Sequence, residues 1–196
     1  PAPVSRPTQT KPAYDFADVR SGAWYYGDVM YAAENGLMNG TSGSTFSPLE
    51  NLTRAQLTAV LYRMDGSPAV SGTCSFTDAK RGAYYADALV WAERNALVNG
   101  YGSGAFGVGD AITREQLVTI LYRYAAYKGI DVSARADLSG YRDAEKISGY
   151  ARDAFGWAVE AGLIRGSGDL LNPQGRTTRA EYAAIAARFH KTFIAK

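Results

Sequence analysis

Cysteine and histidine are nearly absent from this 196-residue chain, which contains only Cys74 and His190. A single cysteine excludes an intrachain disulfide framework. Thiol catalysis needs a histidine and an orienting carboxamide or acid beside the cysteine, and nothing in the sequence brings these together. We therefore expect Cys74 to be a small buried or half-buried thiol, and we expect no metal site and no cofactor.

The chain also lacks a strong charge of either sign and a long hydrophobic run. Its formal net charge is +2, so the sequence does not support polyanion binding driven by bulk charge, as in nucleic-acid-binding proteins, although a local basic site stays open. No apolar run approaches the ~20 residues of a membrane span, so no membrane insertion is expected. Hydrophobic residues make up 46% and charged residues 20% of the chain, which predicts a folded globular domain.

The first 14 residues have the composition of a linker. They include Pro1, Pro3, Pro7 and Pro12 among Ser, Thr, Gln and Lys, and this composition favours an extended, poorly packed chain. A linker directly before a folded module suggests an upstream domain of the same protein.

One pattern occurs three times along the chain. Each copy begins with an aromatic residue, a spacer and Asp, continues through a helix and a glycine-containing loop, and ends with Thr-Arg-x-Gln or Thr-Arg-x-Glu at the start of a second helix. The period is about 60 residues, which means that each copy is one unit too small to bury its own apolar face. We predict one domain with repeats at residues 15–69, 70–130 and 131–196. The copies start at Phe16, Phe76 and Tyr141, and their second helices start at Thr53, Thr113 and Thr178.

The second helix of each repeat is the clearest predicted element. Its apolar residues fall at i, i+3, i+4 and i+7, as in Leu57, Val60, Leu61 and Met64, which is the pattern of an amphipathic helix. The Thr at its start and the Gln or Glu three residues later have the pattern of a capping box. The Arg after the Thr lies where the helix dipole disfavours a cation, so its recurrence needs a further role. It is Arg54, Arg114 and Arg179 in the three repeats.

The first helix of each repeat is predicted over residues 24–35, 84–95 and 150–161. Glycine follows this helix in repeats 1 and 3, where it tolerates a left-handed backbone. Ala96 takes its place in repeat 2 and would be strained, so repeat 2 is expected to close differently. A loop rich in Gly and Ser comes next. Any strand is expected to be short and to lie near the aromatic-x-Asp motifs.

Three helix-loop-helix units with equivalent apolar faces can bury those faces together around a pseudo-threefold axis. We therefore predict a mainly α fold in which the repeats surround a central three-helix bundle, with little or no strand. Grooves would lie between neighbouring repeats, and binding sites in helical assemblies commonly occupy such crevices.

The repeated motifs resemble those of the S-layer homology family, in three tandem copies that cover the chain from Phe16 to Phe189. The motifs of the first copy are Phe16-Ala17-Asp18-Val19, Trp24 with Gly36-Leu37-Met38-Asn39-Gly40, Phe46-Ser47-Pro48 and Thr53-Arg54-Ala55-Gln56. The resemblance implies a three-pronged spindle around the bundle. It also implies a non-catalytic module that anchors exported proteins to the bacterial cell wall, and hence an extracellular location at the cell surface.

The usual partner implied by the resemblance is a secondary cell wall polysaccharide that carries pyruvate ketals on N-acetylmannosamine. The implied pocket residues are the Arg of the Thr-Arg motif, the Asp of the aromatic-x-Asp motif, the Trp that opens the first helix and the glycine after that helix. In this chain they are Arg54, Arg114 and Arg179; Asp18, Asp78 and Asp143; Trp24; and Gly36 and Gly162.

The side-chain chemistry agrees with this role. A pyruvate ketal is a carboxylate on a sugar ring, which a guanidinium can bind through two hydrogen bonds, with backbone N–H groups at the helix start as further donors. Aspartate accepts hydrogen bonds from sugar hydroxyls, and an aromatic ring packs on the apolar face of a pyranose. Tyr84 and Tyr150 take the place of Trp24 in repeats 2 and 3, and Trp91 and Trp157 belong to a second aromatic series that is a candidate lining of the same grooves.

Each candidate also has a purely structural interpretation. The arginines can bridge to a neighbouring Asp, the aspartates can cap or turn the chain before the first helix, and Trp91 and Trp157 can be core residues. The repeats also differ, because Gly107-Val108-Gly109 in repeat 2 replaces Ser47-Pro48, and Arg165 precedes the loop glycine in repeat 3. We therefore expect one or two of the three grooves to be functional.

Three functions from different classes are compatible with this pattern to different degrees. A glycan-binding wall anchor accounts for the repeated Arg and Asp positions, with peptidoglycan as the alternative partner. A protein assembly module of a cell-surface complex would use the same grooves and show a large apolar patch. A wall hydrolase needs a pair of carboxylates across a cleft, and no acidic pair stands apart from the repeat, so the chain is not expected to be an enzyme. For the anchor, Arg54→Ala or Arg114→Ala is expected to weaken wall binding and leave the helical fold intact.

Overall fold

The computed structural model describes residues 14–195, so the linker predicted at residues 1–14 lies outside the described residues except for Tyr14. Within residues 14–195 the chain is helical and contains no strand, only isolated bridges between single residues. The predicted mainly α fold is confirmed. The helices are α1 (Tyr26–Glu34), α2 (Arg54–Met64), α3 (Ala86–Arg94), α4 (Arg114–Tyr127), α5 (Arg152–Glu160) and α6 (Arg179–Phe189), with short helical turns η1 (Ala144–Lys146), η2 (Gly149–Ala151) and η3 (His190–Ile194).

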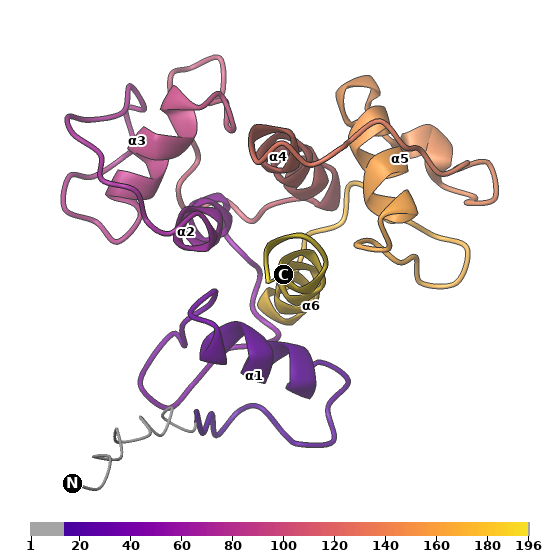
Figure 1. Cartoon of the computed structure of the whole chain (residues 1–196), viewed down its shortest axis with the longest axis horizontal. Coiled ribbons are helices and arrows are strands. Elements are labelled where there is room, and N and C mark those ends of the chain that lie inside the picture. Colours follow the sequence, from indigo (N-terminus) through magenta and orange to yellow (C-terminus); the bar gives the residue numbers. More distant parts are fainter. Residues whose placement is uncertain (1–13, 196) are drawn as a thin grey trace, which may run out of the picture.

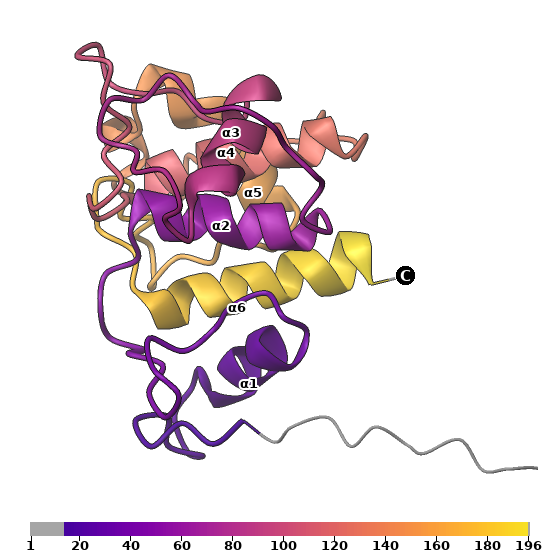
Figure 2. The same ribbon diagram turned by 90° about the vertical axis from the view of Figure 1, so that its left-hand side faces the viewer.

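The second helices of the three repeats, α2, α4 and α6, form the central bundle, and the first helices lie around it (Figure 1). α1 packs against α6, α3 against α2, and α5 against α4. Figure 2 shows the first of these pairs from the side, with α6 between α1 and α2. Each outer helix therefore covers the central helix of the preceding repeat, and repeat 1 closes the ring on repeat 3. No repeat buries its core alone, as expected for a repeat architecture.

The inner faces of the central helices supply the core of the bundle. Leu57, Leu117 and Tyr182 occupy equivalent positions in the three repeats and are fully buried. Farther along the bundle, the ring centroids of Tyr124 and Phe189 lie 5.6 Å apart. Burial of apolar surface, at roughly 25 cal/mol per Å², is the main favourable contribution that holds the repeats together. Among the described residues, no helix is long and apolar enough to cross a membrane.

A closed ring of backbone hydrogen bonds joins the repeats where the central helices begin. The Leu52 N–H donates to the Thr177 carbonyl (2.8 Å), the Thr177 N–H to the Ile112 carbonyl (3.1 Å), and the Ile112 N–H to the Leu52 carbonyl (2.9 Å). Isolated bridges flank this ring, among them Asn51 with Thr178. These bridges do not lie near the aromatic-x-Asp motifs, where the sequence suggested pairing, because three segments converge on the axis and pair there instead.

The central helices start where the sequence predicts, whereas the outer helices start later. Capping boxes begin α2, α4 and α6. The outer helices begin two residues after their predicted starts, because a tight turn precedes each of them. In repeat 1 the Tyr26 N–H bonds to the Ala23 carbonyl, and in repeat 2 the Ala86 N–H bonds to the Ala83 carbonyl. In repeat 3 the turn is the 3₁₀ segment η2.

Ala96 adopts the left-handed backbone that glycine adopts in the other two repeats. Its φ is +54°, compared with +68° at Gly36 and Gly162. The hydrogen bond that follows is also shared, since the Leu97 N–H reaches the Ala92 carbonyl at 2.8 Å just as in repeats 1 and 3. The expectation that repeat 2 closes differently is therefore wrong. The surrounding fold imposes this turn on an alanine, at a cost of about 1–2 kcal/mol.

Candidate ligand-binding grooves

Three equivalent grooves lie between the repeats, with volumes of about 360, 290 and 380 Å³, close to the usual range for small-ligand sites. Each combines a loop and central helix of one repeat, an aromatic residue of the next repeat and an arginine of the preceding repeat. All three repeats therefore contribute to every groove. The principal side chains are Asn39, Gln56, Arg63, Tyr84 and Arg179 in groove 1; Asn99, Gln116, Arg123, Tyr150 and Arg54 in groove 2; and Arg165, Glu181, Arg188, Trp24 and Arg114 in groove 3.

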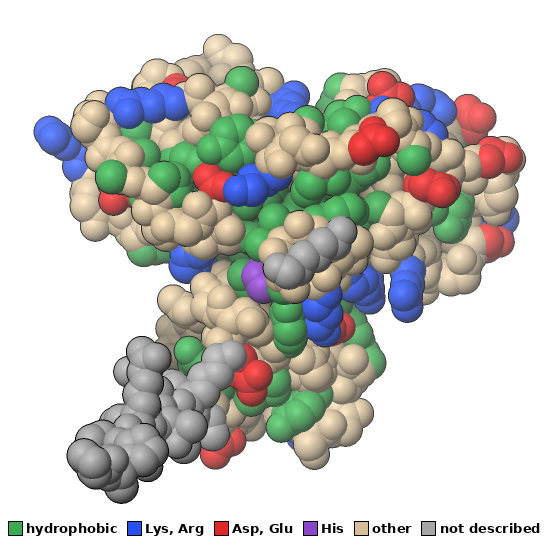
Figure 3. Space-filling view, viewed as in Figure 1, with side chains coloured by type: hydrophobic (Ala, Val, Ile, Leu, Met, Phe, Trp, Pro, Cys, Tyr) green, Lys and Arg blue, Asp and Glu red, His purple; other side chains and the backbone are tan. Residues whose placement is uncertain are grey.

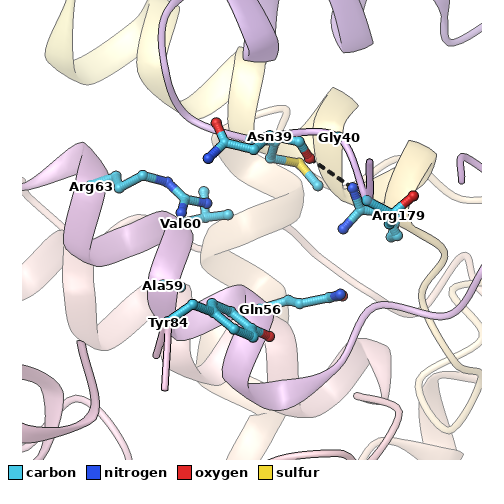
Figure 4. Close-up of a pocket in the computed structure, with 10 residues that line it drawn as sticks. Asn39, Gly40, Gln56, Ala59, Val60, Arg63, Tyr84 and Arg179 are labelled. Atoms are coloured by element: carbon cyan, nitrogen blue, oxygen red, sulfur yellow. Dashed lines mark hydrogen bonds between the residues drawn. The ribbon is translucent and has the colours of Figure 1, made fainter. Parts of the chain in front are cut away.

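Figure 4 shows how the side chains of groove 1 are arranged. Arg63 and Arg179 lie on opposite sides of the groove, with Asn39 and Gly40 along one edge and Tyr84 along the other. Two cations and an aromatic ring thus surround one space.

The arginine of the Thr-Arg motif holds the loop of the next repeat. In groove 1, Arg179 Nε donates to the Phe46 carbonyl (2.8 Å) and Nη2 donates to the Asn39 carbonyl (2.9 Å). Arg54 makes the equivalent bonds in groove 2, at 2.9 Å each. The sequence suggested a bridge to a neighbouring Asp as the structural role, but the partners are backbone carbonyls. Two nitrogens of each of these guanidinium groups are therefore committed to the fold.

These bonds change the expected effect of replacing an arginine of the Thr-Arg motif, the first arginine of each repeat, by alanine. Arg114 also joins two repeats, through Nε to the Leu171 carbonyl (2.8 Å) and Nη2 to the Arg165 carbonyl (3.4 Å). Hydrogen bonds from a charged donor contribute about 1.5–3 kcal/mol each. We therefore expect Arg54→Ala and Arg114→Ala to destabilise the domain, and a loss of binding in these variants would not by itself identify a ligand contact.

The repeated aspartates hold the same loops from the other side. The carboxylate of Asp143 accepts hydrogen bonds from the N–H groups of Leu171 (2.8 Å) and Asn172 (2.7 Å). Asp78 and Asp18 accept equivalent bonds in repeats 2 and 1. Burial alone would raise the pKa of Asp78 and Asp143, but the backbone hydrogen bonds outweigh it and hold both pKa values below the usual range. None of the three lines grooves 1 to 3, so their geometry favours the turn interpretation.

The backbone donors at the start of the central helices are already occupied. In α6, the Arg179 N–H donates to the Glu50 carbonyl (2.8 Å) and the Ala180 N–H to the Pro48 carbonyl (2.9 Å). The Glu181 N–H donates to the hydroxyl oxygen of Thr178. The donors of α4 have equivalent partners. The suggestion that these groups add donors for a ligand is therefore wrong for α4 and α6, because the neighbouring repeat and the cap use them.

The grooves contain a second arginine that sequence reasoning missed. Arg63, Arg123 and Arg188 lie on the central helices, nine positions after the first arginine of each repeat, and line grooves 1, 2 and 3 respectively. Burial lowers the pKa of Arg63 and Arg188, but a guanidinium remains charged at neutral pH. Their recurrence nine positions after the arginine of each Thr-Arg motif is visible in the sequence and could have identified them.

The structure brings one of the two aromatic series to the grooves. Trp24, Tyr84 and Tyr150 line grooves 3, 1 and 2, and they are 66%, 66% and 57% exposed. An exposed ring beside a cation is available to pack on a sugar face. Trp91 and Trp157 are 2% exposed and belong to the hydrophobic core, so the core interpretation describes their position.

The glycines that line the grooves differ from those singled out in the sequence. Gly36 and Gly162 end the outer helices with a positive φ and are not among the lining residues. Gly40 and its counterparts in the other repeats do line the grooves. A Cβ at Gly40 would lie 2.5 Å from the Ser42 carbonyl oxygen and 2.8 Å from the Phe16 ring. Close packing therefore requires glycine at this edge.

An acidic residue distinguishes groove 3 from the others. Grooves 1 and 2 are each lined by two arginines and no acidic residue, whereas groove 3 is lined by three arginines and Glu181. In groove 3, Glu181 replaces the glutamine, and its Oε1 lies 4.0 Å from Arg114 Nη1. A carboxylate at this position repels an anionic ligand and offsets the attraction of one of the three arginines. On the face shown in Figure 3, by contrast, basic and acidic side chains are interspersed, in keeping with the net charge of +2.

Comparison with known proteins identifies the repeats. The S-layer homology domain model matches residues 15–58, 75–118 and 140–183. The chain is 32% identical over 88% of its length to an endoglucanase of Bacillus sp. (strain KSM-635). It is 26% identical over 82% of its length to the surface-layer 125 kDa protein of Lysinibacillus sphaericus and 26% identical over 77% to a cellulosome-anchoring protein of Acetivibrio thermocellus. The chain spans only 18%, 13% and 34% of these proteins, respectively.

The fold and the grooves define a helical repeat module whose candidate sites form between its units. The three family matches cover most of the chain in three ordered copies, so the chain belongs to the S-layer homology domain family. It is accordingly a cell-wall anchoring module of the bacterial cell surface.

Proposed function

We propose that grooves 1 and 2 bind a carboxylate-bearing sugar of the secondary cell wall polysaccharide, of the pyruvylated N-acetylmannosamine type. The observation that carries this proposal is the pair of arginines in each of these grooves, without an acidic lining residue and beside an exposed aromatic ring. A guanidinium pair can bind the carboxylate while the ring packs on the apolar face of the sugar.

The environment of the arginines favours an anionic ligand. Burial lowers the pKa of Arg63 and Arg179 in groove 1 and of Arg54 in groove 2. A cation that has lost part of its hydration gains more from a carboxylate than the same cation in bulk water. The carbonyl bonds of Arg54 and Arg179 also hold these side chains in place before a ligand arrives, which reduces the entropy lost on binding.

The proposed activity is binding without cleavage. Glycoside hydrolysis needs two carboxyl groups at roughly 5–10 Å across the substrate, whereas grooves 1 and 2 offer arginines, amides and aromatic rings. The similarity to an endoglucanase covers 18% of that enzyme, so it supports a shared module and does not transfer the catalytic activity.

We also propose that the module anchors a longer protein. The chain spans at most 34% of each of the three relatives named above. The proline-rich composition of residues 1–14 suits a connection to an upstream domain.

Co-sedimentation with cell-wall sacculi tests the proposed partner. The purified chain is mixed with sacculi before and after mild acid removal of the secondary polysaccharide. Loss of binding after stripping is the expected result. Binding retained on stripped sacculi would make peptidoglycan the partner, and absence of binding to both would favour the protein assembly function.

Variants of the second arginine series test the proposed site. Arg63→Ala with Arg123→Ala removes one cation from each of grooves 1 and 2, and we expect the bound fraction to fall about tenfold because charge-assisted contacts are lost. Arg63 Nε also donates to the Leu37 carbonyl (3.1 Å), so urea unfolding of the variant accompanies the binding measurement and shows that the domain stays folded. Arg152→Ala is the matched control, since Arg152 is exposed and lies outside the three grooves. Equal binding by the wild type, the double variant and Arg152→Ala would overturn the arginine–carboxylate contact.

A further inference from the structure

Groove 2 adjoins a buried carboxylate that has no counterpart in the other repeats. Glu115 is the second residue of α4 and is 5% exposed. The equivalent residues of α2 and α6 are Ala55 and Ala180. A buried charge is costly unless hydrogen bonds compensate for the lost hydration, so the partners of this carboxylate indicate its role.

Three hydrogen bonds from repeat 3 satisfy the carboxylate. Oε1 accepts from the Ser148 hydroxyl (3.1 Å) and the Tyr150 hydroxyl (2.9 Å), and Oε2 accepts from the Ser148 N–H (3.2 Å). Ser148 is itself particular to repeat 3, because Gly22 and Gly82 occupy the position two residues before the groove aromatic in repeats 1 and 2. The acid and its serine donor therefore occur together at one junction and act as a unit.

The Glu115–Ser148 pair fixes the direction in which the aromatic residue of groove 2 donates its hydroxyl proton. Tyr150 lines the groove beside Arg54 and Arg123, and its only hydroxyl proton is donated to Glu115. Its oxygen can then only accept a hydrogen bond from a ligand. Burial and the bond to Glu115 raise the pKa of Tyr150 to about 12, so the hydroxyl keeps this proton at neutral pH. The alanines at the equivalent positions cannot provide the same bond in grooves 1 and 3.

We propose that Glu115 is a positioning residue that makes groove 2 selective for a sugar presenting a hydroxyl or acetamido N–H to the Tyr150 oxygen while its carboxylate contacts Arg54 and Arg123. This inference rests on the proposed function and specifies the chemistry of one groove. Because Glu115 orients the ring before binding, groove 2 loses less side-chain entropy than it would with a free tyrosine. Groove 1, which lacks this acid, is the less selective site.

Binding to groove 2 alone tests the role of Glu115. Arg63→Ala removes one of the two arginines of groove 1, and Arg165→Ala with Arg188→Ala removes two of the three arginines of groove 3, which provides the background protein. The probe is the methyl glycoside of N-acetylmannosamine carrying a 4,6-pyruvate ketal, and its Kd is measured by calorimetry. We expect Glu115→Ala and Tyr150→Phe each to weaken binding about threefold to tenfold, the range for one hydrogen bond. The double variant should be no weaker than either single variant, since both remove the same interaction.

Controls separate positioning from general destabilisation. Glu115→Ala introduces the residue found in repeats 1 and 3. Glu115→Gln keeps an acceptor oxygen, so its affinity for the probe should lie between those of the wild type and Glu115→Ala. In a background of Arg123→Ala, Arg165→Ala and Arg188→Ala, where groove 1 remains, Glu115→Ala should not change the Kd. Without any ligand, NMR titration of ¹³C-labelled tyrosine should show the pKa of Tyr150 falling in Glu115→Ala.

The outcomes distinguish this inference from the proposed function. Unchanged binding in Glu115→Ala, additive losses in the double variant, or an unchanged Tyr150 titration would overturn the positioning role even where Arg123→Ala abolishes binding. No binding of the probe to the background protein, or no effect of Arg123→Ala, would overturn the proposed function for groove 2 and this inference with it.

Discussion

Grooves 1 and 3 share one architecture and differ in how their first arginine is held. In groove 1, Arg179 makes two short bonds to carbonyls, and its guanidinium carbon lies 4.7 Å from the centroid of the Phe46 ring. In groove 3, the second bond of Arg114 is 3.4 Å long, and Glu181 competes for its charge. A symmetric backbone therefore does not make three equal sites, because a few side chains set the electrostatics of each.

The largest expected effect of this difference is on stability. Arg179→Ala removes two charge-assisted bonds and a cation–π contact, so we expect a loss of about 4 kcal/mol in the free energy of unfolding. Arg114→Ala loses one short bond and one long bond and should cost about 2 kcal/mol. Urea unfolding followed by circular dichroism measures both. Equal losses would contradict the inferred difference in how Arg179 and Arg114 are held.

Acid pH tests the loops that border the grooves. The folded-state pKa values of Asp78 and Asp143 are lowered, so their contribution to stability is fully present above the unfolded pKa of about 4 and is lost as pH falls through the lowered folded values. We expect the free energy of unfolding to fall steadily below pH 4. The measurement is urea unfolding at a series of pH values.

Single variants assign this pH dependence to the loops. Asp143→Asn should make the decline shallower, because the group that binds the extra proton is gone. Asp15→Asn is the control, since Asp15 is exposed. A decline of the same slope in Asp143→Asn and the control would contradict the assignment.

A reciprocal exchange tests the role of the groove 3 acid directly. Glu181→Gln should strengthen binding of the pyruvylated probe to groove 3 about fivefold, and Gln56→Glu should weaken groove 1 by a similar factor, because each changes one charge beside the ligand. The cap is kept in both variants, since Gln and Glu already fill this role in the native helices. Calorimetry on proteins with one intact groove measures both constants, and unchanged affinities would show that the acid is irrelevant.

The smallest expected effect concerns backbone strain beside groove 2. Ala96→Gly relieves a left-handed alanine, and we expect a gain of about 0.5–1 kcal/mol after the greater freedom of glycine in the unfolded chain is subtracted. Gly36→Ala makes the opposite change in repeat 1 and should cost a similar amount. Thermal unfolding should show shifts of about 1–4 °C in opposite directions. Shifts of the same sign would mean that the turn is not the source of the strain.

Local patterns were sufficient to predict the central helices. The Thr-Arg-x-Gln/Glu motif places both partners of the capping box within four residues, so the starts of α2, α4 and α6 follow from short-range hydrogen bonds. The outer helices lack a side-chain cap, and their starts depend on turns that packing imposes. This explains why their predicted bounds were less accurate.

The candidate site was only partly predictable for the same reason. Recurrence pointed to the first arginines and to Trp24, Tyr84 and Tyr150, all of which line grooves. It could not separate these from Trp91, because an aromatic residue at helical spacing fits the core and a groove equally well. Whether a side chain faces solvent depends on which helix of another repeat covers it.

The sequence by itself determined the number of repeats, the helical class and the starts of the central helices, because these depend on apolar periodicity and on contacts between residues close in the chain. Only the tertiary structure decided which loop meets which arginine. The bond from Arg179 to the Asn39 carbonyl joins residues 140 positions apart, and it forms because repeat 1 closes the ring on repeat 3. Closure is a property of all three buried faces together, so no single repeat encodes a groove.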